Sequence, residues 1–401
     1  CMSLAVSAAG FTPGEADQLR RAMAAWKRSG AAILKFERKL IDGMIARGYS
    51  QEFAGQVFTQ ISGFSGYGFP ESHAASFALL VYASCWLKCH TPAAFAAALI
   101  NSQPMGFYQP AQIIRDAKEH GVEVRPIDAM LSRWDCTLEP RNSARSEFDT
   151  STQPAIRLGM RLVKGLSQAH AERIVAMLED GPRPRTLDEL ARIARKKGVP
   201  IEALRHLARA DAFGSLGLSR RQALWTLTRL DADALPLFDG LPDEAAHAED
   251  ADSSLHLPMV NPADEVTLDY ARAQLSLKAH PISFVREELD RLRVVPARHL
   301  RDETHTPAGT RVTVAGLVLV RQRPGTASGI VFMTIEDETG IANVIVFPKV
   351  YQRCRAAAKH SVAVLCTGRI ERQGEVVHVK AARIRRLELH TGLPAGSRDF
   401  H

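Results

Sequence analysis

The sequence of 401 residues lacks any run of about eighteen apolar residues, the length that a membrane-spanning helix needs. Its first residues, Cys1-Met2-Ser3-Leu4, carry no basic side chain and do not resemble a signal peptide. None of its six cysteines belongs to a CxxC pair, which argues against a zinc site and against a disulfide framework. We therefore expect buried thiols, no bound metal, no membrane partner and a cytoplasmic location.

Lysine and arginine are missing from one internal segment. None occurs between Leu230 and Ala271, although that segment contains eleven Asp and Glu residues. The net charge of +7 therefore understates how basic the rest of the chain is. A basic body favours a polyanionic partner, most simply nucleic acid, although a generic basic surface would give the same balance. Residues 231–262, rich in Asp, Ala, Leu and Pro, predict an acidic flexible linker.

Residues 1–125 predict a helical region. The stretch Thr12-Pro13-Gly14-Glu15 is typical of a helix start, because threonine caps the helix, proline fits its first turn and glutamate follows three residues later. Apolar spacing predicts further helices over residues 31–47, 51–61, 74–90 and 93–101.

Residues 63–73 combine three glycines, three aromatic residues and a histidine just before an apolar helix. Glycine lets the backbone approach a ligand closely, while aromatic rings and histidine can contact a base and a phosphate. This mixture suits a nucleotide pocket. A tight loop between helices, with aromatic rings that fill the core, would explain the same composition.

Residues 155–230, which follow a connecting segment over 126–154, predict tandem helix-hairpin-helix modules. Each of two helix pairs is associated with a turn in which glycine lies between apolar residues. Such a turn presents backbone N–H groups at a helix N-terminus, where a phosphate oxygen is favoured. An ordinary helical hairpin with a glycine turn would look similar. The residues that we assign to DNA binding are Lys164, Gly165, Ser167 and Gly214.

After a helical connector over 263–305, residues 306–390 predict an all-β domain, and 391–401 form a tail. Three strands, a helix and a final hairpin follow one another in the order of an OB-fold barrel. Its first loop is basic and lies where such barrels engage single strands, although a purely structural barrel is the alternative. The residues that we assign to DNA binding here are Arg321, Arg323, Phe332, Arg369 and Lys380.

Together, these modules resemble the C-terminal part of a bacterial C-family DNA polymerase, a member of the polymerase III alpha subunit family. The resemblance covers nearly the whole chain and implies a multidomain protein, with all-α fingers and a tandem helix-hairpin-helix region followed by an all-β OB-fold barrel. The segments that carry it are Gly10-Phe11-Thr12-Pro13-Gly14-Glu15-Ala16-Asp17, Leu19-Arg20-Arg21-Ala22-Met23, Gly66-Tyr67-Gly68-Phe69, Ser72-His73-Ala74, Trp86-Leu87-Lys88 and His90-Thr91-Pro92-Ala93.

Two details resemble the error-prone, damage-induced branch of that family. The chain has Pro70-Glu71 before Ser72-His73, where the replicative branch typically has Asn-Lys. It also stops soon after the OB-fold, in Ser397-Arg398-Asp399-Phe400-His401, an ending that resembles the error-prone branch.

The resemblance implies roles for several residues of the fingers. Arg20 and Arg21 would contact the triphosphate of the incoming nucleotide, since paired guanidinium groups can clamp a polyphosphate with charge-assisted hydrogen bonds. Adjacent arginines on a helix are otherwise more typical of a solvated face. Tyr67, Gly68 and His73 would line the nucleotide pocket, with Lys88 as an additional candidate.

The function implied is error-prone DNA synthesis in damage-induced mutagenesis and translesion synthesis. Its ligands would be dNTP, primer-template and single-stranded template DNA, and other mutagenesis proteins would be its partners. Mg²⁺ is expected for the complete enzyme, held by palm carboxylates that we do not find in this sequence. We therefore assign no catalytic and no metal-binding residue, and we expect the chain to be inactive alone.

Two other interpretations stay open. The first is a non-catalytic DNA-binding repair scaffold built from helix-hairpin-helix and OB modules. The second is an OB-containing RNA-binding protein, for which the sequence offers no signal specific to a 2′-hydroxyl group.

Overall fold

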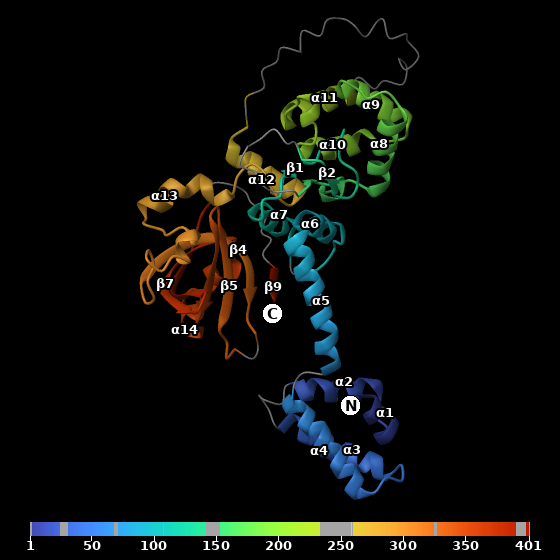
Figure 1. Cartoon of the computed structure of the whole chain (residues 1–401), viewed down its shortest axis with the longest axis vertical. Coiled ribbons are helices and arrows are strands. Elements are labelled where there is room, and N and C mark those ends of the chain that lie inside the picture. Colours follow the sequence, from blue (N-terminus) through green and yellow to red (C-terminus); the bar gives the residue numbers. More distant parts are fainter. Residues whose placement is uncertain are drawn as a thin grey trace, which may run out of the picture. The chain divides into compact units, whose positions relative to one another are not determined.

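The computed structural model describes residues 2–24, 31–67, 71–106, 108–141, 153–232, 258, 260–324, 327–389 and 398–400. These residues belong to two compact units, Cys1–Trp86 and Leu87–His401, which are described separately below (Figure 1). Among them, no helix is both long enough and apolar enough to cross a membrane.

The first unit is helical. Its core gathers small and large apolar side chains, among them Leu19, Leu40 and Met44. The predicted helix start is confirmed, because Thr12 and Glu15 exchange hydrogen bonds of 3.0 and 3.3 Å between side chain and backbone amide. The helices are α1 (Met2–Ala9), α2 (Pro13–Ala24), α3 (Ala31–Ile45), α4 (Gln51–Tyr67) and α5 (Glu71–His90), of which the last ends in the second unit.

The segment with three glycines is more helical than the sequence predicts. Helix α4 continues to Tyr67, whereas we expected it to end at residue 61 and to give way to a loop. Helix α5 begins at Glu71, three residues earlier than expected. Isolated glycines are tolerated within a helix at a cost of about 1 kcal/mol each, so their presence did not exclude helix. Residues 68–70 lie outside the described residues.

The second unit begins with two helices and a small sheet. Helices α6 (Pro92–Asn101) and α7 (Pro110–Glu119) both start at a proline, which fits the first turn of a helix. Three short strands follow, in the order β1-β3-β2. The predicted connecting segment thus contributes a strand of its own. The strands are β1 (Val124–Arg125), β2 (Thr137–Glu139) and β3 (Ala155–Arg157).

Four helices then form the helix-hairpin-helix region, drawn in green in Figure 1. Its core includes Ile174, Leu190, Leu207 and Phe213, all nearly or fully buried. The elements are the 3-10 turn η1 (Met160–Leu162), α8 (Gln168–Asp180), α9 (Leu187–Lys196), α10 (Ile201–Arg209), the 3-10 turn η2 (Gly214–Leu216) and α11 (Arg220–Ala232).

Helix α12 packs on this region although an acidic segment separates the two in the sequence. Ala273 at its end and the following Leu275 belong to the same buried core as the helix-hairpin-helix residues. A connector then leads to the barrel. Its elements are α12 (Pro262–Ala273), η6 (Pro281–Val285), α13 (Arg286–Arg291) and η7 (Ala297–Leu300).

The last domain is a closed five-stranded barrel, as predicted. Its strands pair in the order β5-β6-β8-β7-β4, and an additional β4–β5 pairing closes the cylinder. Its interior holds alternate apolar residues of each strand, such as Val314, Ile335 and Cys366. The elements are β4 (Arg311–Gln322), β5 (Val331–Asp337), β6 (Gly340–Val346), α14 (Pro348–Arg353), α15 (Arg355–His360), β7 (Ala363–Gln373) and β8 (Val376–Arg386). A short strand, β9 (Arg398–Phe400), pairs in parallel with β4.

Candidate nucleic-acid interface

The first glycine turn, residues 163–167, adopts the geometry that the sequence predicts. Gly165 has a φ of +91°, which favours glycine, and a Cβ there would lie 2.5 Å from Cε1 of His206. Ser167 caps helix α8 by accepting a hydrogen bond of 3.3 Å from the amide of His170. Lys164 is exposed, and its amide donates to the carbonyl of Arg272 at 2.8 Å.

Two amides of this turn are available to a ligand. Within the part of the chain that the structure describes, the N–H groups of Gly165 and Ser167 donate to no protein acceptor. They precede the first turn of α8, where the helix dipole adds positive potential. A phosphate oxygen would therefore find open donors and the exposed Lys164 together.

The second glycine turn differs, because an internal carboxylate already fills it. Asp128, which is buried, accepts from the amide of Ser215 at 2.9 Å and from its hydroxyl at 2.7 Å. The glycine with positive φ in this turn is Gly217, whereas Gly214 is the residue that we assigned to DNA binding. A negative charge held at this turn opposes a phosphate there, so the contact predicted for Gly214 gains no support from the geometry.

Sequence reasoning missed a third glycine turn, between α9 and α10. Gly198 has a φ of +74°, and its carbonyl accepts from the guanidinium of Arg173 at 3.0 Å. The signal was present, since glycine follows two lysines and precedes Val-Pro. The role of Asp128 had no such signal, because only the fold brings it to a turn that lies 87 residues away in sequence.

A row of side chains crosses the outside of the barrel. Strand register pairs Arg311 on β4 with Arg369 on β7, and Arg369 with Lys380 on β8. The same row continues from Lys380 to Ile345 on β6 and from Ile345 to Phe332 on β5. Paired residues on neighbouring strands present their side chains to the same face. We call these five residues the barrel row.

The barrel row joins three cations to an exposed aromatic ring. Arg311 and Arg369 are exposed, and Phe332 keeps 36% of its surface accessible. The ammonium of Lys380 lies 2.5 Å from the carboxylate of Glu371, and the guanidinium of Arg369 donates to the carbonyl of Gly309 at 3.2 Å. Like charges directly opposite each other on adjacent strands are destabilising without a counter-charge. The predicted residues Phe332, Arg369 and Lys380 thus lie together on one face.

Arg321 was wrongly assigned to DNA binding. Its side chain is buried, and its guanidinium donates to the carbonyls of Ala358, at 2.9 Å, and Ser361. The reason is its register in β4: after a register shift between Val318 and Val320, Arg321 pairs with Met333, a residue of the barrel interior. Arg323, by contrast, is exposed, with its guanidinium 5.5 Å from the ring centre of Tyr351.

The residues assigned to the fingers are only partly described. Arg20 and Arg21 lie on α2, Tyr67 ends α4, and His73 lies in the first turn of α5. The positions of their side chains, and all of Gly68, fall outside the described residues, so these roles stay predictions. Lys88 is described: its ammonium pairs with Asp116 of α7 at 2.8 Å.

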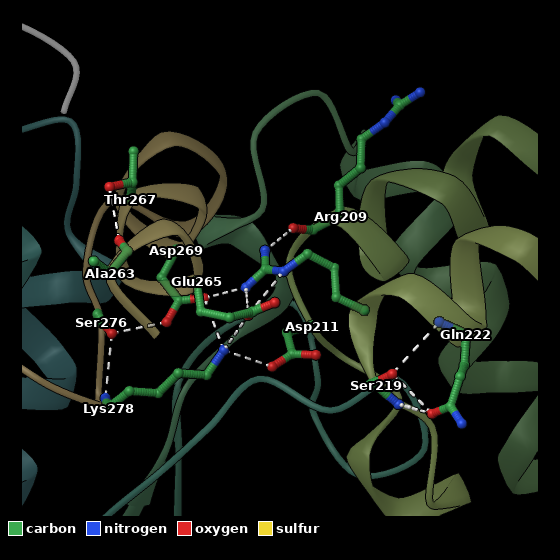
Figure 2. A network of polar contacts seen from close by, with 11 residues as sticks. Arg209, Asp211, Ser219, Gln222, Ala263, Glu265, Thr267, Asp269, Ser276 and Lys278 are labelled. Carbon is green, nitrogen blue, oxygen red and sulfur yellow. Dashed lines mark hydrogen bonds and ion pairs between the residues drawn. The ribbon is translucent and has the colours of Figure 1, made fainter. Parts of the chain in front are cut away.

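One cluster of carboxylates has the spacing of a metal site. Oxygen atoms of Asp211, Glu265 and Asp269 all lie within 4.8 Å of one another. Two cations already lie among them (Figure 2). Lys278 Nζ is 2.8 Å from Asp211 and 2.7 Å from Glu265, and Arg220 Nη2 is 2.9 Å from Glu265.

These cations lower the pKa of one carboxyl group of the cluster. Burial alone would raise the pKa of Glu265, but hydrogen bonds from Lys278 and Arg220 outweigh it and hold that pKa below its ordinary value. Burial alone would likewise lower the pKa of Lys278, yet its bonds to Asp211 and Glu265 raise it. The cluster is thus an ion-pair network in which a lysine occupies the place of a metal, and it does not fit the Mg²⁺ of a polymerase.

Three family models match the chain. The bacterial DNA polymerase III alpha subunit finger domain matches residues 1–48, a helix-hairpin-helix motif matches 121–223, and an OB-fold nucleic acid binding domain matches 312–387.

Curated relatives match almost the whole chain. Error-prone DNA polymerase 2 of Rhizobium meliloti (strain 1021) is 49% identical over 386 residues, which cover 96% of this chain and 34% of the relative. Error-prone DNA polymerase 1 of Agrobacterium fabrum is 49% identical over 99% of this chain and 36% of its own length. The corresponding protein of Methylococcus capsulatus is 46% identical, with 100% and 38% covered. The chain thus spans about a third of the length of these relatives.

Solved structures align only in part. Asparaginyl-tRNA synthetase from Pyrococcus horikoshii shares 22% identity at a TM-score of 0.21, which covers 25% of this chain and 24% of the synthetase. The hypothetical protein ygiW from E. coli shares 18% identity at a TM-score of 0.19, over 23% of this chain and 89% of its own. Scores this low support no conclusion.

Proposed function

Because the chain belongs to the family of bacterial DNA polymerase III alpha subunits, with error-prone DNA polymerases as relatives along nearly its whole length, we propose that it forms the DNA-binding and nucleotide-contacting part of an error-prone DNA polymerase. The reaction would be DNA-directed DNA synthesis past damaged template bases. Its ligands would be primer-template DNA, single-stranded template and dNTP, and its place the cytoplasm.

The barrel row is the observation that carries the DNA-binding part of this proposal. Phe332 offers a ring on which a base can stack, and the three cations continue from it across neighbouring strands. Stacking on an aromatic ring together with basic groups along the backbone is the usual way to hold a single strand. A bound phosphate chain would also relieve the mutual repulsion of the three cations.

The open turn at residues 163–167 supplies a second contact in the proposal. Its amides and Lys164 would bind a phosphate of the duplex, because contacts to phosphates position a protein without reading the sequence. Arg20 and Arg21 would clamp the triphosphate, and Tyr67, Gly68 and His73 would line the pocket of the incoming nucleotide.

Magnesium would belong to another part of the polymerase. When bound, Mg²⁺ would align the attacking and leaving oxygens of the nucleotidyl transfer. We place it on palm carboxylates outside this chain, because the three-carboxylate cluster of the described residues is already paired with Lys278 and Arg220.

Binding of single-stranded DNA tests the proposal. Replacement Arg369→Ser should weaken binding of an oligothymidine about fivefold at moderate salt, because one phosphate contact is lost. The slope of log Kd against log salt concentration should fall by about 0.7, the value for one phosphate of a single strand. Fluorescence anisotropy at several salt concentrations measures both quantities.

A matched control uses another exposed cation. Arg291 on α13 is exposed and pairs with Glu287 of the same helix, away from the barrel row. Its replacement by serine should leave affinity and slope unchanged. If both substitutions change affinity and salt slope equally, the barrel row has no specific role, and a generic basic surface explains the binding.

A non-catalytic repair scaffold is the alternative function. Both functions require DNA binding, but only the polymerase requires a nucleotide contact in the fingers. Hydrogen exchange with and without dNTP, in the presence of primer-template, separates them. Protection of residues 18–24 by dNTP favours the polymerase, and its absence favours the scaffold.

A further inference from the structure

Helix α12 contacts the open turn directly, although it lies outside the matched helix-hairpin-helix region. The carbonyl of Arg272, in its last turn, accepts the amide hydrogen of Lys164 at 2.8 Å. The family match ends at residue 223, and twenty-nine residues separate the end of α11 from the start of α12. A distant segment of the chain therefore holds the turn in which the amides of Gly165 and Ser167, among the described residues, donate to no protein acceptor.

We propose that α12 is a working part of the DNA-binding module, and that Arg220 and Lys278 are positioning residues that set the phosphate-binding turn at residues 163–167. The proposal rests on the function proposed above for this turn. It assigns to the ion-pair network a role in DNA binding without any contact to DNA.

Arg220 joins α12 to the helix-hairpin-helix core. It begins helix α11, and its side chain is only 4% exposed. Its guanidinium donates to Glu265 and Asp269, both on α12, and to the carbonyl of Arg209 at the end of α10. One planar group thus fixes three helices against one another, which a guanidinium can do because its donors point in fixed directions.

Lys278 completes the connection from the other side. It follows α12 in the sequence and reaches back to Glu265 and Asp269 of that helix, and also to Asp211 after α10 (Figure 2). Ser276 supports this return, because its hydroxyl donates to Asp269 at 2.7 Å and accepts from the amide of Lys278 at 3.2 Å. The chain leaving α12 is therefore anchored within six residues of Arg272.

The balance of charge makes the network sensitive to single changes. Three carboxylates face two cations, so removal of either cation leaves carboxylates without a counter-charge at a site that is half-buried or buried. An uncompensated carboxylate in such a place is strongly unfavourable, and α12 would shift to expose it to water. The Arg272 carbonyl would move with the helix, and the Lys164 amide would lose its acceptor.

The main test is Lys278→Met, which keeps the length of the side chain and removes its charge. Lys278 is 41% exposed, so the variant should fold. We expect Kd for primer-template DNA to rise about fivefold, as a contact energy near 1 kcal/mol would give. The salt slope should stay unchanged, because Lys278 contacts no phosphate. Lys278→Arg should restore the affinity, and the exposed Arg291→Met is the control.

Hydrogen exchange identifies where the change acts. In Lys278→Met the amides of residues 163–167 should exchange faster, while those of α9, which the network does not touch, should keep their protection. Faster exchange throughout the module would indicate general destabilisation and would overturn the proposal.

A double-substitution cycle with Lys164→Met separates a failure of the positioning role from a failure of the function proposed for the turn. If Lys278 acts through the turn, its substitution should weaken binding less in the Lys164→Met background than alone. Additive effects would overturn the positioning role. If Lys164→Met alone leaves DNA affinity and salt slope unchanged, the function proposed for the turn fails instead. Ser276→Ala is a smaller change in the same network. It should raise Kd less than Lys278→Met does, and its effect should likewise shrink in the Lys164→Met background.

Discussion

Arginine residues of this chain have opposite roles at nearly adjacent positions. The guanidinium of Arg321 is buried and donates to backbone carbonyls, whereas that of Arg323 is exposed beside Tyr351. Both belong to the basic loop region that the sequence predicts to bind DNA. Arg321 lies within β4 and pairs with Met333 of the barrel interior, whereas Arg323 follows the end of that strand at Gln322. The sequence alone does not show where the strand ends.

This pair gives a prediction about stability and binding. Arg321→Met should lower the free energy of unfolding by about 2 kcal/mol, because two carbonyls lose their donor. Its DNA affinity per folded molecule should stay the same. Arg323→Met should show the reverse, with weaker DNA binding and little loss of stability. Urea unfolding and anisotropy measure the two quantities, and a loss of affinity in folded Arg321→Met would contradict the assignment.

At the scale of elements, features set by local sequence signals could be predicted, whereas features set by long-range contacts could not. The capping pattern at Thr12 and the order of strands in the barrel were predicted correctly, because capping and alternation are local properties. The extension of α4 to Tyr67 was not predicted, because glycine lowers helix propensity without excluding a helix. The docking of α12 had no local signal at all, since its partners lie before the acidic segment.

The stability that the ion-pair network around α12 gives to the fold should depend on pH. The pKa of Glu265 in the folded protein lies below its ordinary value of 4.5, since its bonds to the cations outweigh burial. Its contribution to stability is therefore present above about pH 4.5 and is lost as the pH falls through the lower folded pKa. The loss of stability from Glu265→Gln should be largest near neutral pH and should shrink toward pH 3.

Thermal unfolding of the chain and of Glu265→Gln from pH 7 to pH 3 checks this expectation. Glu287→Gln provides a control, since the exposed Glu287 of α13 pairs with Arg291 and belongs to no part of this network. A difference between Glu265→Gln and the parent chain that stays constant over the whole range would contradict the proposed ionisation.

At the scale of the whole molecule, nucleotide contacts and metal chemistry belong to different parts of the proposed polymerase. The chain spans about a third of the length of its relatives. It contains a match to the finger domain, and the carboxylate cluster of its described residues is paired with Lys278 and Arg220. A polymerase needs both parts, because the fingers select a nucleotide and the metal-bearing carboxylates transfer it.

The isolated chain should therefore bind primer-template DNA without extending it. A primer-extension assay with dNTP and Mg²⁺ should give no product, while anisotropy under the same conditions should report binding. Magnesium-dependent incorporation that survives repeated purification would contradict this division of roles. Absence of binding under conditions where the chain is folded would contradict the DNA-binding proposal itself.

The sequence by itself determined the order of the modules, the family resemblance and three residues of the barrel row, Phe332, Arg369 and Lys380. These depend on local periodicity and on short motifs, which are properties of neighbouring residues. Only the tertiary structure decided that Arg321 is buried, that Asp128 fills the second glycine turn and that α12 supports the first. Each of these three facts joins segments that are far apart in the chain. Burial and electrostatic pairing depend on which segments fold together, and no local pattern contains that information.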